Sequence, residues 1–122
     1  MLRKLLIALL ITTAAAAPVS AAMTTGTFVT RARALQAQGM GAVLSPDFQT
    51  LRGEAHAATQ QLKAERAARA AAGKKPIACV PEGQSIGILE MLNGLEALSP
   101  AEKKLPLKDG YAHVLAKQFP CR

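Results

Sequence analysis

The chain has 122 residues and a formal net charge of +7, with 15 Lys and Arg against 8 Asp and Glu. It has no Trp, one Tyr and three Phe, so it offers few aromatic rings on which bases or sugars could stack. This composition argues against a dedicated nucleic-acid or glycan binder, and the length predicts a single domain near the small end of what one core stabilises.

The first 22 residues have the order of a secretory signal peptide. Two cations come first, an apolar run follows from 5 to 11, and small residues end the segment. The run is shorter than the roughly 20 residues that a spanning helix needs, so a membrane anchor is the weaker alternative. We expect cleavage before Ala22 or Met23, export to the periplasm, and one helical domain over 23–122 with no further membrane span. Loss of the two cations leaves a net charge of +5.

Helix signals dominate the rest of the chain. Thr27 is placed to cap a first helix from Phe28 to about Gln38, and Gly39 and Gly41 are expected to end it. Its apolar residues recur at spacings of four and three along one face, which is typical of a helix packed on a core: Phe28, Ala32 and Leu35.

The strongest start signal is Ser45-Pro46-Asp47, an N-cap followed by a proline and an acid in the first turn. It predicts a helix to about Ala72, close to 40 Å long at 1.5 Å per residue. Its apolar stripe ends near Leu62, so the distal part of the helix is expected to project past the core. The stripe comprises Phe48, Leu51, Ala55, Ala58 and Leu62.

The distal part of this helix is basic, with Lys63, Arg66 and Arg69, and Lys74 and Lys75 follow directly. The simplest interpretation is a solvated helix end whose cations offset the negative end of the helix dipole. The alternative is a docking surface for an acidic partner or an anionic lipid, with Arg66 and Arg69 as the candidate contact residues.

A third helix is expected to be capped by Ser85 and to run from Ile86 to Leu98. Its apolar residues cover about half of the circumference, which is typical of a central core helix or of a dimer face. We therefore expect a homodimer. These apolar residues are Ile86, Ile88, Leu89, Met91, Leu92, Leu95 and Leu98.

The remaining segment carries two more helix signals. Ser99 and Glu102 have the spacing of a capping box and predict a short turn of helix, and Pro106 precedes a last helix that ends near Gln118. The buried stripe of the last helix is expected to be Leu107, Tyr111, Val114, Leu115 and Phe119. No segment alternates as a strand does, so the sequence predicts an all-α fold, a small bundle of about four helices with one of them long.

Cys79 and Cys121 are the only cysteines. Export places them in an oxidising compartment, and such a pair in a small exported chain predicts one intramolecular disulfide. The bond would close a loop of about 42 residues and contribute about 4 kcal/mol in the chain-entropy model. An intermolecular disulfide and two free thiols are the alternatives. An intramolecular bond explains why a cysteine stands at the chain's end, where it staples the last helix.

The sequence contains no recognised catalytic or cofactor-binding pattern. His56 and His113 fall off the apolar faces of their helices and are not spaced as a metal pair. Phosphate loops, serine-nucleophile elbows and zinc-protease helix motifs are absent. Asp47 and Asp109 are expected to be first-turn helix residues. We therefore expect a binding or structural protein, with no enzyme activity, no metal and no cofactor.

Residues 79–121 resemble the C-terminal half of the type VI secretion amidase-immunity family, the Rap/Tai immunity proteins. The segment opens with a Cys-Val-Pro-Glu-Gly turn at 79–83, continues through an amphipathic helix and a proline-containing link, and ends in Phe-Pro-Cys at 119–121. It covers under half of the mature chain, and the further cysteine pair common in the N-terminal half of family members is missing. The resemblance implies a periplasmic, disulfide-bonded, often dimeric all-α protein that binds a peptidoglycan-cleaving amidase and occludes its active site.

The candidate contact with such an amidase is the turn formed by Pro81, Glu82 and Gly83. A disulfide at Cys79 and the ring of Pro81 would restrain it, Glu82 would offer a carboxylate to a polar cleft, and Gly83 permits close approach. The simpler interpretation is a solvated connection between an extended segment and a helix. The alternative function is a constitutive periplasmic structural or chaperone-like helical module with no toxin partner.

Overall fold

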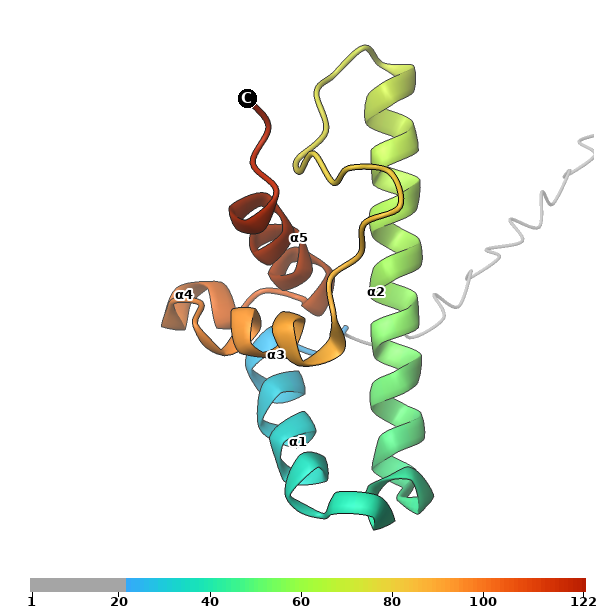
Figure 1. Ribbon diagram of the computed structural model, residues 1–122, viewed down its shortest axis with the longest axis vertical. Helices are drawn as coiled ribbons and strands as arrows, with labels where there is room; N and C mark the ends of the chain where they lie inside the picture. The colour runs from blue at the N-terminus through green and yellow to red at the C-terminus, as the bar shows by residue number, and fades with distance from the viewer. Residues whose placement is uncertain (1–21) are drawn as a thin grey trace, which may run out of the picture.

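The computed structural model describes residues 22–122, which form an all-α fold (Figure 1). The described part of the chain contains no strand beyond a single antiparallel bridge between Thr24 and Pro106. The predicted signal peptide, apart from Ala22, lies outside the described residues, and its cleavage stays a prediction. The elements are α1 Thr25–Ala37, a 3-10 segment η1 Gly39–Leu44, α2 Pro46–Ala71, α3 Ile88–Glu96, α4 Pro100–Lys103 and α5 Leu107–Gln118. The predicted bundle of about four main helices, one of them long, is confirmed.

Helix α1 begins three residues earlier than its capping pattern suggests. The N-cap is Thr24, whose side-chain oxygen accepts a hydrogen bond from the Thr27 backbone N–H at 3.2 Å. The prediction of Thr27 as the cap was therefore wrong. The reason is tertiary, because the backbone N–H of Thr25 donates to the Leu105 carbonyl at 2.9 Å and that of Leu107 to the Met23 carbonyl at 3.0 Å. These bonds place the helix start against the link before α5.

The end of α1 lies close to its predicted position, but the chain does not continue as an open loop. Gly39 has a φ of 65°, a left-handed conformation that glycine adopts without steric cost. The following residues form η1, which exposes Met40 and Leu44 almost completely. The prediction that Gly41 marks the end of a helix was wrong, because Gly41 lies inside η1.

Helix α2 begins as predicted, with Ser45 as the N-cap and its hydroxyl accepting from the Asp47 N–H at 3.2 Å. The Asp47 carboxylate also forms an ion pair with Arg31 of α1, which fixes the start of α2 against α1. At the other end, the helix extends past the core as predicted, because no residue of α2 beyond Ala58 is buried, but this distal part has neighbours. Glu65 forms an ion pair with Lys108 of α5, and the chain after α2 runs back beside it (Figure 1).

Helix α3 is shorter than predicted, at nine residues. Its N-cap is Gly87, which has no side chain to cap with, so the predicted cap at Ser85 was wrong and Ile86 lies before the helix. Helices α4 and α5 match their predictions more closely. Ser99 and Glu102 form the predicted capping box, and α5 ends at Gln118.

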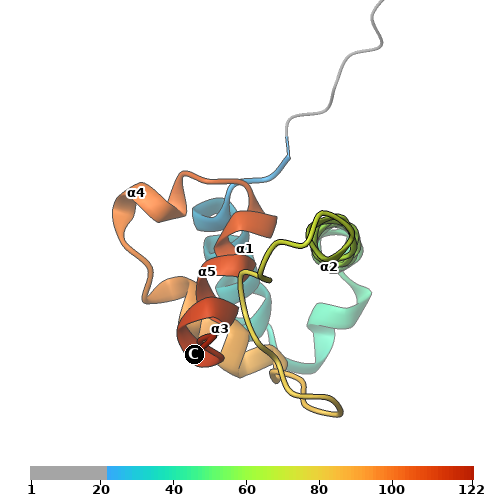
Figure 2. The same cartoon turned by 90° about the horizontal axis from the view of Figure 1, so that it is seen from above.

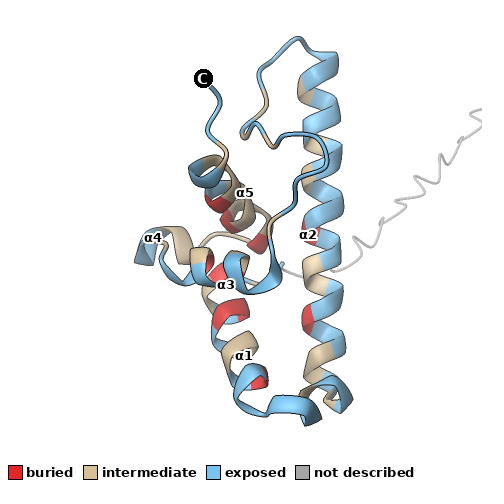
Figure 3. Ribbon diagram, in the orientation of Figure 1, coloured by how far each residue is buried: buried red, intermediate tan, exposed pale blue. Residues whose placement is uncertain are grey.

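The core lies where α1, α3 and α5 face one another, and one face of α2 packs against it (Figure 3). Leu95 of α3 and Thr25 of α1 are fully buried, at 0% exposure. Of the 26 residues of α2, only Leu51 and Ala58 are buried. Viewed from above, α2 stands beside the cluster of the other helices rather than within it (Figure 2). The buried apolar residues are Phe28, Val29, Leu35, Leu51, Ala58, Leu92, Leu95, Leu107 and Val114.

Two glycines bring the core helices close together. At Gly110 of α5, a Cβ atom would lie 2.7 Å from Thr25 Cγ2, and at Gly94 of α3 it would lie 2.7 Å from Val114 Cγ1. Carbon atoms do not approach one another so closely without a shift of the backbone. The Thr25 hydroxyl occupies the space that Gly110 leaves and donates to the Leu105 carbonyl at 3.0 Å, so this buried polar group is satisfied.

We predict that Gly110→Ala lowers the free energy of unfolding by about 1–3 kcal/mol, as overpacking of a core does, because the new methyl group overlaps Thr25. Urea denaturation followed by far-UV circular dichroism measures it. Gly53→Ala is the matched control, because a Cβ at this helical site meets nothing within 4 Å. The control should gain up to about 1 kcal/mol from helix propensity. Equal midpoints for Gly110→Ala and the wild-type chain would contradict the close packing.

Candidate functional site

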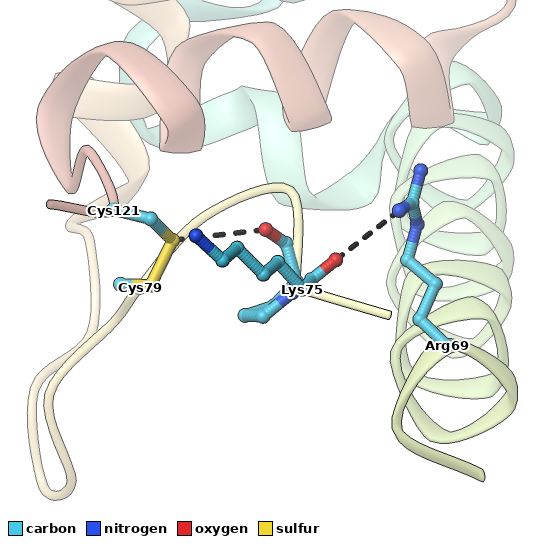
Figure 4. The surroundings of a disulfide bond; sticks show 5 residues. Arg69, Lys75, Cys79 and Cys121 are labelled. Atoms are coloured by element: carbon cyan, nitrogen blue, oxygen red, sulfur yellow. Dashed lines mark hydrogen bonds between the residues drawn. A yellow bond between two sulfur atoms is a disulfide. The ribbon is translucent and has the colours of Figure 1, made fainter. Parts of the chain in front are cut away.

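The predicted disulfide is present between Cys79 and Cys121, with a Cα–Cα separation of 5.0 Å and a sequence separation of 42. Next to it, the backbone N–H of Cys79 donates to the carbonyl of Phe119 at 2.8 Å. The Cys121 sulfur also lies 3.6 Å from the Pro76 carbonyl oxygen, a packing contact because a disulfide sulfur carries no proton (Figure 4). The chain end and the segment after α2 are thus joined at one place.

Two residues beyond Cys79, the chain makes a tight turn. The N–H of Gln84 donates to the carbonyl of Pro81 at 3.1 Å, and Gly83 has a φ of 76°. A positive φ at the third residue is the requirement of a type II turn, which glycine meets. Pro81, Glu82 and Gly83 are all exposed, and no ion pair among residues 22–122 involves Glu82. The Glu82 carboxylate therefore stands in solvent on a turn that the disulfide anchors.

A second feature is an apolar groove of about 980 Å³ that runs along one side of α2. Helices α1 and α5 pack against both α2 and α3, so they form the floor, while α2 and α3 stand as the walls. The segment before α3 closes one end. The apolar residues that line the groove include Phe28, Leu35, Phe48, Leu51, Ala55, Leu62, Ile77, Val80, Ile86, Ile88, Leu89, Met91, Leu92, Leu95, Tyr111 and Leu115.

The wall formed by α3 is open to solvent. Ile88 is 88% exposed and Leu89 is 57% exposed, although both line the groove. The predicted apolar face of the third helix is therefore divided, because Leu92 and Leu95 are buried in the core while the first turn of the helix is not. The width of the apolar face led to the expectation of a core helix or a dimer face, but the sequence did not show that the exposed part would be the first turn.

The α2 wall of the groove is basic toward its C-terminal end. Lys63, Arg66 and Arg69 line the groove there, and the Arg69 guanidinium donates to the carbonyl of Lys75 at 3.1 Å (Figure 4). No ion pair found among residues 22–122 involves these three side chains. Arg52 is a further cation on the lining, nearer the start of α2.

The single carboxylate on the groove lining is already engaged. Glu65 pairs with Lys108, and this hydrogen bond is the main reason why the pKa of Lys108 is raised above its usual value. The ammonium group also lies 3.9 Å from Asp109. The basic character of the distal α2 wall is therefore not cancelled by the acids near it.

The other titratable residues singled out from the sequence lie apart from both features. His56 and His113 are exposed, as predicted, and His113 Nδ1 lies 3.2 Å from Glu102 Oε2. Glu102 has a lowered pKa, chiefly because the Ser99 backbone N–H donates to its carboxylate. Within the described residues, no three His, Cys, Asp or Glu side chains are grouped so that they could hold a metal ion.

The structure therefore separates the predicted contact residues into two sets. Arg66 and Arg69 belong to the groove lining, whereas Pro81, Glu82 and Gly83 lie on the exposed turn beyond Val80, which is the last groove residue before the turn. Groove residues precede the turn at Val80 and follow it from Ser85. A partner could engage the turn without entering the groove.

Comparisons with protein-family models, with curated proteins and with solved structures find no match to this chain. The resemblance of residues 79–121 to amidase-immunity proteins consequently stays a hypothesis that rests on the residues quoted for it. None of the helices within residues 22–122 combines the length and the hydropathy needed to cross a membrane.

We predict that replacing both Cys79 and Cys121 by Ser lowers the free energy of unfolding by about 2–5 kcal/mol, the usual effect of removing a native disulfide from a small domain. The double variant avoids leaving one reactive thiol. Chemical denaturation of the oxidised chain, the reduced chain and the variant measures the effect. Reduced wild-type protein should behave like the variant, and titratable thiols in native protein would contradict the bond.

Tyr111 provides a spectroscopic test, because it is the only tyrosine and lies edge-on to Phe28 with ring centroids 6.3 Å apart. Burial raises its pKa to about 12, against about 10 in an unfolded chain. The resulting stabilisation is complete below pH about 10 and is lost as the pH rises through about 12. Ultraviolet absorbance should show ionisation of the native phenol near pH 12 and that of the urea-unfolded phenol near 10. Coincident titrations would show that Tyr111 is solvated.

Proposed function

We propose that this chain is an exported inhibitor of a peptidoglycan-cleaving amidase, with no catalytic activity of its own, and that it acts by inserting the turn at Pro81, Glu82 and Gly83 into the enzyme's active-site cleft. The proposal includes cleavage of the signal peptide and residence in the periplasm, where the disulfide would form. Its starting point is the resemblance of residues 79–121 to the amidase-immunity family.

The main support for the proposal is that the exposed turn is anchored directly beside the disulfide. Cys79 is bonded to Cys121 and its N–H donates to the carbonyl of Phe119. The turn begins two residues later, at Pro81, and the Gln84–Pro81 hydrogen bond closes it. A protruding element that is already ordered loses little conformational entropy on binding. Such an element is what occlusion of a cleft requires.

The chemistry of the turn also suits an enzyme cleft. Glu82, which forms no ion pair with residues 22–122, presents a carboxylate that can accept hydrogen bonds or bind a cation, and charge-assisted hydrogen bonds are the stronger ones. Gly83 carries no side chain and its φ of 76° excludes most other residues. A wall of the cleft could therefore approach the backbone closely on this side of the turn.

A constitutive periplasmic module, structural or chaperone-like, is the second candidate function. The apolar groove favours it, because apolar surface of this extent marks an interaction site. The genomic neighbourhood separates the two candidates. A gene for a secreted amidase next to the gene of this chain favours inhibition, and a housekeeping neighbourhood favours the module.

The homodimer predicted from the sequence stays a separate proposal, and it would use the exposed part of α3. Ile88 and Leu89 are the exposed apolar residues of α3, and they are the part of the predicted dimer face that the core does not use. Static light scattering of the purified chain at tens of micromolar determines the mass. A monomer mass at that concentration would contradict the homodimer and leave the inhibitor proposal unaffected.

We predict that the purified exported chain inhibits the amidase encoded beside its gene, and that Glu82→Lys weakens the inhibition at least tenfold, or by about 1.4 kcal/mol. Glu54→Lys, at a site in α2 that no ion pair among residues 22–122 involves, is the matched control and should inhibit like the wild-type chain. Inhibition constants and thermal midpoints are measured for all three proteins.

These measurements test the role of the turn and the inhibitor function separately. Equal inhibition by Glu82→Lys and Glu54→Lys would remove the turn from the mechanism and keep the inhibitor. Failure of the wild-type chain to bind any amidase of its own organism, in an assay where a known inhibitor works, would overturn the proposed function.

A further inference from the structure

The groove has the form of a helical bundle with one position left empty. Helices α1 and α5 are covered on one side by α2 and on another by α3, and the space between α2 and α3 is lined by apolar side chains and holds about 980 Å³. Phe48, Ala55 and Leu62 follow one another along α2 at helical spacing and remain on the groove lining, although that spacing is typical of a helix packed on its neighbours. A further helix would complete their packing.

The openness of the groove indicates what kind of ligand it takes. Small-molecule pockets bury most of their ligand, whereas this groove has a wall that is largely in solvent, with Ile88 at 88% exposure. A partner lying here would keep one side in water. An amphipathic helix satisfies both conditions, because its apolar face enters the groove and its polar face stays hydrated.

The charges along the groove indicate the sign of that polar face. Lys63, Arg66 and Arg69 line the distal part, and Arg52 adds a cation nearer the start of α2. The one carboxylate on the lining, Glu65, is paired with Lys108. Potentials across an interface are usually complementary in sign, so a helix with carboxylates along its edges fits and a basic helix does not.

Charge also argues against a second copy of this chain as the occupant of the groove. Each exported copy would carry a net charge of +5, and a second α2 would bring the same basic end toward Arg66 and Arg69. Like charges brought together at an interface are costly. A homodimer through Ile88 and Leu89 would occupy this same wall of the groove, so it is the competing use of the surface.

We propose that the groove between α2 and α3 binds an acidic amphipathic helix of a partner protein, with the apolar face of that helix on α1, α3 and α5 and its carboxylates beside Lys63, Arg66 and Arg69. The basic end of α2 is then a docking surface rather than only a solvated helix end. This inference does not depend on amidase inhibition, because the turn at Glu82 lies outside the groove.

The test uses three designed helical peptides without aromatic residues, added to the purified exported chain. The first has a leucine face flanked by glutamates, the second has lysine in place of each glutamate, and the third has glutamine in place of each leucine. Calorimetry gives the affinities, and the fluorescence of Tyr111, the only tyrosine in a chain without tryptophan, reports entry because Tyr111 lines the groove. We expect the acidic leucine peptide to bind at least tenfold more tightly than either of the others, with an affinity that falls as salt rises.

Three variants locate the binding. Arg66→Glu with Arg69→Glu should weaken the acidic peptide at least tenfold and strengthen the basic one. Lys104→Glu with Lys117→Glu changes the net charge equally at exposed residues outside the groove and should change neither affinity more than about twofold. Ile88→Glu removes apolar surface from the wall, and because Ile88 is exposed it should weaken binding with an unchanged thermal midpoint.

Other results would overturn the proposal. Equal affinities for the acidic and basic peptides, or for the leucine and glutamine peptides, would show that charge or apolar contact plays no part. Binding to anionic phospholipid vesicles with no binding of any peptide would assign the surface to a membrane. Sedimentation showing a dimer that Ile88→Glu dissociates would assign the groove to a second copy of the chain.

Discussion

Helices α1 and α5 meet at a contact that depends on the absence of a side chain. Thr25 is fully buried and fills the space above Gly110, where any Cβ atom would overlap it. The Thr25 hydroxyl and its N–H both donate to the carbonyl of Leu105, so the start of the described chain is held against the link before α5. Because these two helices form the floor of the groove, the position of both walls depends on this contact. Leu95 of α3 packs into the same place, 3.1 Å from where a Gly110 Cβ would be.

Both walls are held by apolar burial, since Leu92 and Leu95 of α3 and Leu51 and Ala58 of α2 are in the core. Helix α2 is also positioned by ion pairs from Asp47 to Arg31 and from Glu65 to Lys108. Surface ion pairs contribute little stability, so the covalent link is important. The disulfide bonds Cys79, in the segment that follows α2, to Cys121, which follows α5 (Figure 4). It therefore holds that segment beside the end of α5.

The same covalent link connects two surfaces of different chemistry. On one side of Cys79 the chain leads back past Lys75 to the basic end of α2, and on the other it enters the turn that carries Glu82. The turn is small, anionic and ordered, which suits entry into a cleft, whereas the groove is long, apolar and basic, which suits a helix. Each of the two proposed contacts uses one of these surfaces. Each proposal can fail without the other, because they use separate residues.

Local chemistry was sufficient to predict much of this architecture. Ser45 and Pro46 marked the start of α2, and Ser99 and Glu102 marked the capping box, because each signal acts over a few residues. The disulfide was predicted because the chain has only two cysteines, which allow a single intramolecular pairing. The predictions at Thr27 and Ser85 were wrong. Tertiary bonds to Leu105 moved the start of α1, and α3 begins at Ile88 after Gly87, an N-cap without a side chain.

The candidate site, too, was predicted from the sequence only in part. The turn at Glu82 and the cations Arg66 and Arg69 were found from the sequence, because a proline-glycine turn and a run of basic residues are local patterns. The groove was not found from the sequence, because Ile88 and Leu92 belong to the same apolar stretch. The spacing of apolar residues in that stretch does not show which of them the core covers. That depends on how closely α1 and α5 approach at Gly110, and on α2 standing beside the core rather than in it. Such distances arise between segments far apart in the chain, so only the tertiary structure decided them.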